Sequence, residues 1–209
     1  MTSNYHSHVA HPWHGLTPGE NCPEEVLAYI EMVPADTCKY ETDKESGLLM
    51  LDRPQKFSNH CPCLYGFIPQ TYCYEDSAAY AMKKTGKKGI VGDKDPIDIC
   101  VLAERNINHG NIIVQAKVIG GLRFFDGEEA DDKIIAVLKD DMLYSSFTDI
   151  TDVSSRVLDR LKHYFLTYKQ GPDTDKVECE ITDTYGRLEA YDIINASRSD
   201  YQRFIHASA

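Results

Sequence analysis

Segments that favour β-strands fill roughly the first two thirds of this 209-residue chain, and helical periodicity appears only near its end. Strand patterns cover 26–33, 39–41, 48–51, 97–103, 111–120 and 133–138. The pair 39–41 and 48–51 brackets an Asp-Lys-Glu-Ser-Gly turn, as in a β-hairpin. Strands followed by helices predict an α+β fold, mainly β, in which a small closed sheet is covered on one side by helices.

Two helices are predicted in the last third of the chain. Asp152 can act as an N-cap, and apolar side chains then recur at three-and-four spacing until Gly171 and Pro172 end the pattern. A second stripe follows Gly186, and it consists of Leu188, Tyr191, Ile194 and Ile205. Both helices would bury one apolar face against the sheet.

Composition and charge limit the class of protein. Hydrophobic residues make up 42% and charged residues 26%, so we expect one globular domain over residues 1–209. The net charge of −11 argues against nucleic acid and anionic membranes as partners. Seven cysteines without a Cys-x-x-Cys pair and the absence of a long apolar run indicate a soluble protein of the reducing cytoplasm, without a membrane segment.

Two polar stretches interrupt the strand patterns. Residues 1–22 carry histidines at positions 6, 8, 11 and 14, and we expect an arm that is disordered or packed on the surface. A metal site and a partner-binding arm are the alternatives. Residues 74–91 contain the basic run 83–89, and we expect a long mobile loop there, with a lid that attracts anions as the alternative.

Acidic side chains gather beside two predicted strands. Asp93, Asp95 and Asp98 surround Pro96 directly before the apolar run 99–103. Three carboxylates so close repel one another, and a divalent cation relieves the repulsion, so the pattern indicates a site for a hard cation. A second acidic group precedes Lys133 and the next strand, and it comprises Asp126, Glu128, Glu129, Asp131 and Asp132. A solvated acidic loop is the alternative for either group considered alone.

Cationic and hydroxyl side chains are placed where they could bind an anion. Lys39 and Glu41 share one face of a predicted strand, and the guanidinium of Arg53 could bind phosphate oxygens in a bidentate manner. Tyr65 and the pair Tyr168 and Lys169 could add further donors. Surface ion pairs, core packing and a helix C-terminal cation are their alternative roles.

With these motifs the chain resembles the soluble inorganic pyrophosphatases of the metal-dependent family I. The most specific match is Asp93-Lys94-Asp95-Pro96-Ile97-Asp98, the counterpart of that family's Asp-x-Asp-Pro-x-Asp signature. Further matches follow in order at 30–35, 39–41, 43–47, 52–53, 62–66, 126, 131, 133, 163–165 and 168–169. The resemblance implies a five-stranded OB-like closed β-barrel with two flanking C-terminal helices and a homo-oligomer, often a hexamer.

The resemblance also implies the activity and the residue roles. Pyrophosphate would be hydrolysed to two phosphates by metal-activated water, which supports phosphate metabolism by removing pyrophosphate. Mg²⁺ would be the cofactor, and its ligands would be Asp93, Asp98, Asp131 and Asp126, supported by Glu31 and Glu41. Asp95 would be the general base. The phosphates would be held by Lys39, Arg53, Lys133, Tyr168 and Lys169, with Tyr65 lining the site; Lys39, Arg53 and Lys133 would also take part in catalysis.

Three positions differ from the family pattern. Lys94 stands where that family usually has a small residue such as glycine, and Cys61 stands where many members have a tyrosine. The stretch 74–91 is longer than in compact bacterial members. Two other functions stay open: a non-catalytic OB-type module that binds polyanions, and a nucleotide phosphohydrolase, for which we find no base-binding pocket.

Overall fold

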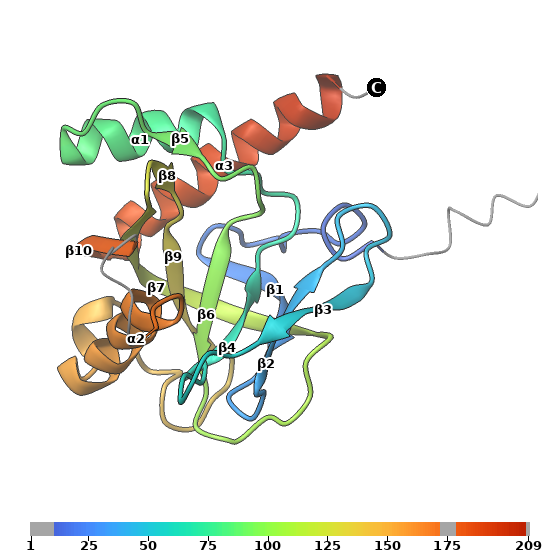
Figure 1. Ribbon diagram of the computed structural model, residues 1–209, viewed down its shortest axis with the longest axis vertical. Helices are drawn as coiled ribbons and strands as arrows, with labels where there is room; N and C mark the ends of the chain where they lie inside the picture. Colours follow the sequence, from blue (N-terminus) through green and yellow to red (C-terminus); the bar gives the residue numbers. More distant parts are fainter. Residues whose placement is uncertain (1–10, 172–178, 208–209) are drawn as a thin grey trace, which may run out of the picture.

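The computed structural model describes residues 11–171 and 179–207. The strands are β1 (Glu25–Met32), β2 (Cys38–Thr42), β3 (Leu49–Pro54), β4 (Leu64–Phe67), β5 (Val91–Gly92), β6 (Asp98–Leu102), β7 (Ile112–Asp126), β8 (Glu129–Ala130), β9 (Lys133–Leu138) and β10 (Cys179–Gly186). The helices are α1 (Glu75–Thr85), the 3-10 turn η2 (Ile150–Asp152), α2 (Ser155–Thr167) and α3 (Arg187–Ala207). Figure 1 shows their arrangement.

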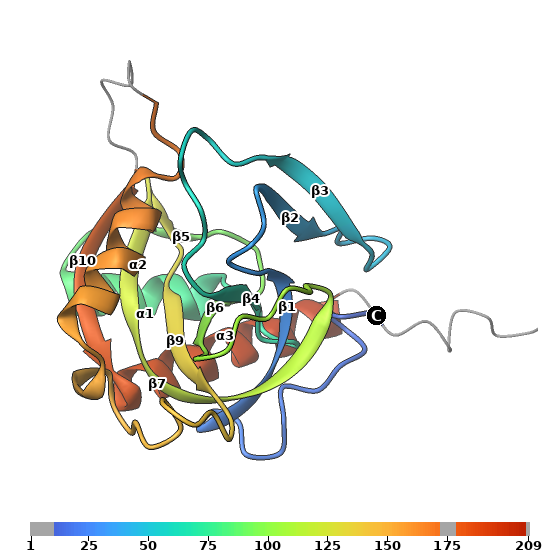
Figure 2. The same ribbon diagram turned by 90° about the horizontal axis from the view of Figure 1, so that it is seen from below.

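Five strands form a closed ring in the order β1, β4, β6, β9 and β7, and pairing of β1 with β7 completes the circle. All neighbours are antiparallel except β6 and β9, which run parallel. The ring confirms the prediction of a mainly β core compatible with an OB-like barrel. The hairpin of β2 and β3 forms a separate sheet that stands away from the ring in Figure 2.

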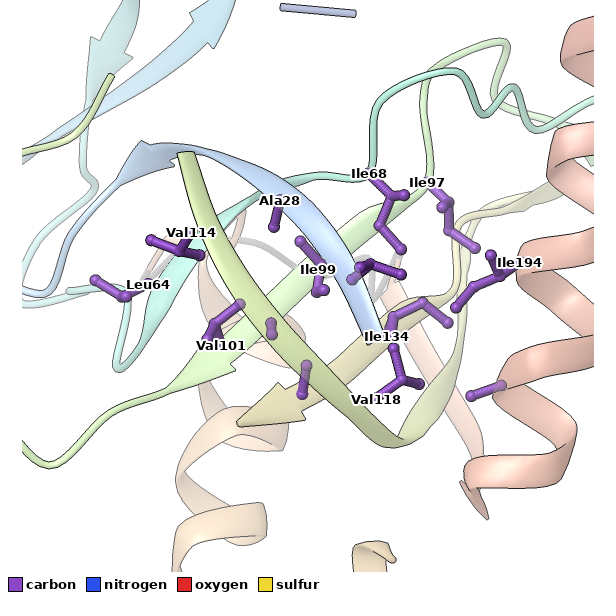
Figure 3. Close-up of a cluster of buried hydrophobic side chains, with 14 of the residues drawn as sticks. Ala28, Leu64, Ile68, Ile97, Ile99, Val101, Val114, Val118, Ile134 and Ile194 are labelled. Atoms are coloured by element: carbon purple, nitrogen blue, oxygen red, sulfur yellow. The ribbon is translucent and has the colours of Figure 1, made fainter. Parts of the chain in front are cut away.

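Strands β4, β6 and β9 are buried on both faces over most of their length, which explains their continuous apolar runs. In β6, Ile99 and Val101 belong to the cluster inside the ring, whereas Cys100 and Leu102 belong to a second cluster that includes residues of α2. Figure 3 shows the inner cluster, where Ile194 of α3 packs at one end of the enclosed space. Both predicted C-terminal helices flank the ring, but α2 packs on the second cluster and α3 on the inner one, so the prediction that helices cover one side only is wrong.

The prediction of a mobile loop over 74–91 is wrong. Residues 75–85 form α1, which lies beside α3 in Figure 1. The buried Ala78 and Ala81 pack with Ile90, Phe125 and Ala130. The N-cap residue of α1, Tyr74, provides no side-chain cap. Instead, Asp200 of α3 accepts hydrogen bonds of 3.0 Å from the amides of residues 74, 76 and 77.

The described part of the N-terminal arm is packed on the surface of the molecule. Trp13 is only 4% exposed, and its indole Nε1 donates a 2.8 Å hydrogen bond to the carbonyl of Thr71. The ring of Trp13 also stacks on Phe204 of α3. His6 and His8 lie outside the described residues.

Other element boundaries differ from the sequence predictions. The predictions missed β4 and β10, and β7 extends to Asp126. Helix α2 is capped by Ser154, whereas Asp152 lies in the preceding 3-10 turn. In α3 the predicted Leu188 is 72% exposed, and Ile193 is buried next to Ile194 instead. Within the described ranges, no helix is both long and apolar enough to span a bilayer.

Candidate active site

A cavity of about 450 Å³ lies between the ring, the β2–β3 hairpin and the end of α2. Every site residue predicted from the sequence lines it. These residues are Glu31, Lys39, Glu41, Arg53, Tyr65, Asp93, Asp95, Asp98, Asp126, Asp131, Lys133, Tyr168 and Lys169. The fold thus brings together side chains from segments that lie far apart in the sequence.

The loop that carries the first acidic group is shaped by backbone contacts. The amide of Asp95 donates to a carboxylate oxygen of Asp93 at 3.0 Å. Cys73 holds the loop from the other side, because its amide donates to the carbonyl of Asp95 at 2.8 Å and its carbonyl accepts from Lys94. Lys94 itself has a φ of 64°, in the left-handed region. A glycine adopts this conformation without a steric penalty, which explains why a small residue suits this position.

Parallel pairing of β6 with β9 sets Asp98 directly opposite Lys133. The ammonium of Lys133 forms ion pairs with the carboxylates of Asp98 and Asp131, the latter at 2.5 Å. Its side chain is 3% exposed and lies 5.0 Å from the ring centre of Phe124. Burial disfavours the charge on Lys133, but the two carboxylates outweigh this effect and raise its pKa well above the usual value.

Buried carboxylates face one another on the ring side of the cavity. Burial, followed by repulsion from Asp131, raises the pKa of Asp93 well above its usual value. Burial raises the pKa of Asp131 to about 7, although Lys133 opposes the shift. Burial and mutual repulsion therefore disfavour ionisation of these carboxylates. A divalent cation would relieve the repulsion, and carboxylate oxygens are the ligands that Mg²⁺ prefers, so the donor set fits such an ion.

The second acidic group divides between two environments. Asp126, Glu129 and Asp131 line the cavity. Asp132 instead forms a 3.1 Å ion pair with the buried Arg123 and accepts a 3.0 Å hydrogen bond from the hydroxyl of Tyr185. Consecutive residues 131 and 132 therefore serve the cavity and the core, respectively.

The β2–β3 hairpin supplies the cationic wall. The register sets Lys39 opposite Arg53. Lys39 pairs with Glu41 and lies 3.5 Å from the carboxylate of Asp52, which also pairs with Arg53. These cations are now neutralised by carboxylates of the same hairpin. An entering anion could exchange partners with them.

Glu31 connects the ring to this hairpin. It lies at the end of β1, is 7% exposed, and accepts a 2.6 Å hydrogen bond from the amide of Thr42 in β2. Burial raises the pKa of Glu31 to about 7. The proton or a cation at Glu31 would therefore affect how the hairpin is held on the ring.

Hydroxyl groups complete the lining. The buried Tyr65 donates its hydroxyl to a carboxylate oxygen of Asp98, and burial raises its pKa well above the usual value. Tyr168 caps the C-terminus of α2, and burial raises its pKa to about 12, so its hydroxyl is protonated at neutral pH. Lys169 next to it pairs with Asp126.

No group of three or more His, Cys, Asp or Glu side chains in the described part of the chain already has the geometry of a metal site. Lysines occupy the spaces between the carboxylates, as the ion pairs of Lys133 and Lys169 show. Coordination of a cation by Asp131 and its neighbours therefore requires these ammonium groups to change partners.

Several other lining residues had no predicted role. Lys44 lies in the turn between β2 and β3, and its ammonium forms an ion pair with the carboxylate of Asp95. Lys44 belongs to the segment 43–47 that resembles the family, and this match could have pointed to Lys44 as a site residue. Trp13 also lines the cavity, and nothing in its local sequence pattern indicated this. Cys61, in contrast, is 2% exposed and does not line the cavity; its sulfur lies 4.0 Å from that of Cys63.

Comparisons with known proteins identify relatives of this chain. The family model described as inorganic pyrophosphatase matches residues 28–202. An inorganic pyrophosphatase of Chlamydia trachomatis serovar L2 is 50% identical over 197 residues, which cover 92% of this chain and 94% of that protein. Soluble inorganic pyrophosphatase 2 of Chlamydomonas reinhardtii is 34% identical over 200 residues, 96% of this chain and 93% of that one.

The solved structures show the same likeness. The crystal structure of an inorganic pyrophosphatase from Thermus thermophilus superposes with a TM-score of 0.77 and 27% sequence identity, and the match covers 93% of this chain and 99% of that chain. The motifs, the shared cavity, the family match and the fold together lead to one conclusion. The chain belongs to the inorganic pyrophosphatase family, whose members hydrolyse pyrophosphate to phosphate.

Proposed function

We propose that this chain hydrolyses pyrophosphate with Mg²⁺ held by Asp93, Asp98, Asp131 and Asp126 and with Glu31 and Glu41 as supporting carboxylates. Enzymes of this family depend on metal ions, and we propose that the ion is Mg²⁺. When bound, the cation neutralises phosphate charge and lowers the pKa of a coordinated water. The observation that carries the proposal is that all of these carboxylates line the same cavity as the predicted lysine and arginine side chains.

In this scheme Asp95 accepts the proton of the attacking water. It lines the cavity beside the other carboxylates, and burial raises its pKa, while the ammonium of Lys44 acts in the opposite direction. A carboxylate with a raised pKa is a stronger base than one with the usual pKa. Its backbone is fixed by Cys73, so the carboxylate projects from a rigid loop.

The cationic wall would bind and stabilise the phosphates. Lys39, Arg53, Lys133 and Lys169 are all paired with carboxylates. When a polyanion and its cations enter, the ammonium and guanidinium groups can turn to phosphate oxygens while the carboxylates turn to the cations. Tyr168 would donate its hydroxyl, and Tyr65 would fix Asp98. Charge that develops on the leaving phosphate is thereby stabilised.

The base is tested with Asp95→Asn. We expect turnover to fall by about 10²-fold or more, the scale of general-base removal, with unchanged thermal stability. Phosphate release from pyrophosphate is the measurement. Asp159→Asn, an exposed position on α2, is the control and should retain full activity. Near-normal turnover of Asp95→Asn would refute the assignment of the base.

The cofactor is tested by chelation. We expect removal of divalent cations to abolish phosphate release and added Mg²⁺ to restore it, because the cavity carboxylates otherwise repel the substrate. Activity that survives exhaustive chelation would contradict the metal mechanism. The same assay with nucleoside triphosphates tests whether pyrophosphate is preferred.

We also propose a cytoplasmic enzyme built as one domain over residues 1–209 and assembled as a homo-oligomer, with a hexamer favoured. The resemblance to the bacterial enzymes supports the oligomer, and the cysteine pattern supports the compartment. Pyrophosphate is the small-molecule partner, and the net charge of −11 speaks against nucleic acid. Sedimentation equilibrium of the full chain tests the assembly.

A further inference from the structure

The segment formed by residues 11–15, called the N-terminal segment below, is anchored beside the cavity. Trp13 donates its indole hydrogen to the carbonyl of Thr71, and its own carbonyl accepts a 2.9 Å hydrogen bond from the amide of Gln70. His14 hydrogen bonds at 2.8 Å to the hydroxyl of Tyr201 in α3. The segment is therefore bound to both the ring side and the last helix.

The same segment contacts the turn of the β2–β3 hairpin. The ring Nε2 of His11 lies 3.2 Å from the carbonyl oxygen of Lys44. A Cβ added to Gly47 would meet the His11 ring at 2.8 Å, so turn and segment pack closely. Asp43 closes the turn internally by accepting from the amide of Ser46 at 2.8 Å. Lys44 thus projects from a turn that is fixed on two sides.

On its other side, the N-terminal segment reaches the loop of Asp95 through Thr71. The hydroxyl of Thr71, whose carbonyl binds Trp13, accepts a 3.0 Å hydrogen bond from the amide of Ile97. Two residues further, Cys73 holds the carbonyl of Asp95. One short segment therefore supports both the lysine and the carboxylate that meet in the cavity.

Lys44 and Asp95 form an ion pair, and their side chains are 56% and 45% exposed. A pair so exposed contributes little to stability because solvent screens it. It does restrict the orientation of the carboxylate, since an ammonium bound to one oxygen limits rotation of the group. The second oxygen is then kept in place to accept a proton.

We propose that Lys44, held by the N-terminal segment, is a positioning residue that orients Asp95 for proton transfer. The inference rests on the proposed role of Asp95 as the base. It gives the described part of the N-terminal arm a function in catalysis. Lys44 acts through Asp95 and need not touch the phosphates.

The test is Lys44→Met in the full chain, with Lys44→Arg as the conservative variant. We expect kcat to fall about tenfold, because a misplaced catalytic group loses rate steeply, and KM to stay within about twofold. Lys44→Arg should recover most of the loss. Lys88→Met removes an exposed lysine that has no ion pair among the described residues, and it should match the wild type.

A double-mutant cycle separates this inference from the role of Asp95. If Lys44 acts through Asp95, the variant with both Lys44→Met and Asp95→Asn should be no slower than Asp95→Asn alone. If the losses in kcat of the two single variants multiply in the double variant, the positioning role is overturned. An unchanged kcat of Lys44→Met would also overturn it. A rise in KM alone would show instead that Lys44 binds phosphate. A normal turnover of Asp95→Asn would instead refute the base.

Trp13 provides a readout that does not depend on turnover. It is the only tryptophan of the chain and it lines the cavity, so its fluorescence should change when pyrophosphate is added together with Mg²⁺. His11→Ala should lower kcat about threefold and alter this fluorescence change, because the turn of Lys44 loses a contact. His109→Ala, at an exposed position, is the control. An unchanged kcat of His11→Ala would show that the N-terminal segment does not hold Lys44 in place.

Discussion

At Gly66 in β4 the backbone of β1 approaches so closely that only glycine fits. A Cβ at this position would lie 1.8 Å from the carbonyl oxygen of Tyr29. The clash is with main chain, which cannot turn away as a flexible side chain could. β4, which carries Tyr65 into the cavity, can therefore pair with β1 only because residue 66 has no side chain.

We expect Gly66→Ala to lower the free energy of unfolding by more than about 3 kcal/mol, because β1 and β4 must separate to admit the methyl group. Urea denaturation measures the change. Gly127→Asn is the matched control, since no atom lies within 4 Å of its added Cβ and asparagine tolerates the φ of 62°. Wild-type stability of Gly66→Ala would contradict the strand pairing.

Residue types and spacing predicted which side chains share the cavity, but not the local geometry that brings them there. The order Asp93, Asp95, Pro96 and Asp98 indicated a cation site, and the structure brings these acids to one cavity. The left-handed backbone at Lys94 could not be predicted, because it is imposed by the contact of that loop with Cys73. The position of Lys44 over Asp95 likewise depends on how the hairpin folds onto the ring.

At the scale of elements, α1 shows what sequence patterns cannot reveal. Its basic and polar composition suggested a loop, and no residue at its start provides a cap. The cap comes from Asp200, which is distant in the sequence and 1% exposed. Its carboxylate accepts four hydrogen bonds from residues 74–77, and one of them is a 2.9 Å bond from the hydroxyl of Ser77.

We expect Asp200→Asn to destabilise the protein by about 2 kcal/mol, since a buried carboxylate that accepts several hydrogen bonds is replaced by a neutral amide. Hydrogen exchange should show faster opening of α1 than of the ring strands. Asp159→Asn on the exposed face of α2 should change stability by less than about 0.5 kcal/mol. Equal protection of α1 in wild type and variant would contradict the capping role.

The strands were predicted where local alternation or apolar runs exist. The prediction for β9 matches its observed bounds, 133–138, because residues 134–137 are apolar and buried on both faces. In contrast, β10 shows no regular alternation of buried and exposed residues, so its pairing with β7 decides its conformation. The prediction for β7 ended at Gly120, where a register shift bends the strand without ending it.

For the whole molecule, the cavity carboxylates link stability to pH. The pKa of Glu31 and that of Asp131 are raised to about 7, and that of Asp93 is also raised, all mainly by burial. In the unfolded chain such groups titrate near pH 4. Between about pH 4 and pH 7 the folded state therefore binds more protons, and the contribution of these groups to stability falls as pH rises.

We expect the free energy of unfolding of the metal-free protein to decline from pH 5 to pH 7.5 relative to that of Asp131→Asn, by more than about 1 kcal/mol. Added Mg²⁺ should remove most of this decline in the wild type, because the cation replaces the protons. Urea titrations at several pH values provide the measurement. Parallel pH profiles of the two proteins would contradict the link.

The closure of the ring between β1 and β7 has a consequence for synthesis. Glu25 pairs with Lys117, so β1 cannot pair with β7 until about ninety more residues have been synthesised. While the ribosome is still adding those residues, one edge of β1 stays open to other chains. A chaperone that shields nascent β1 would therefore improve the yield of folded enzyme more than one that acts after release.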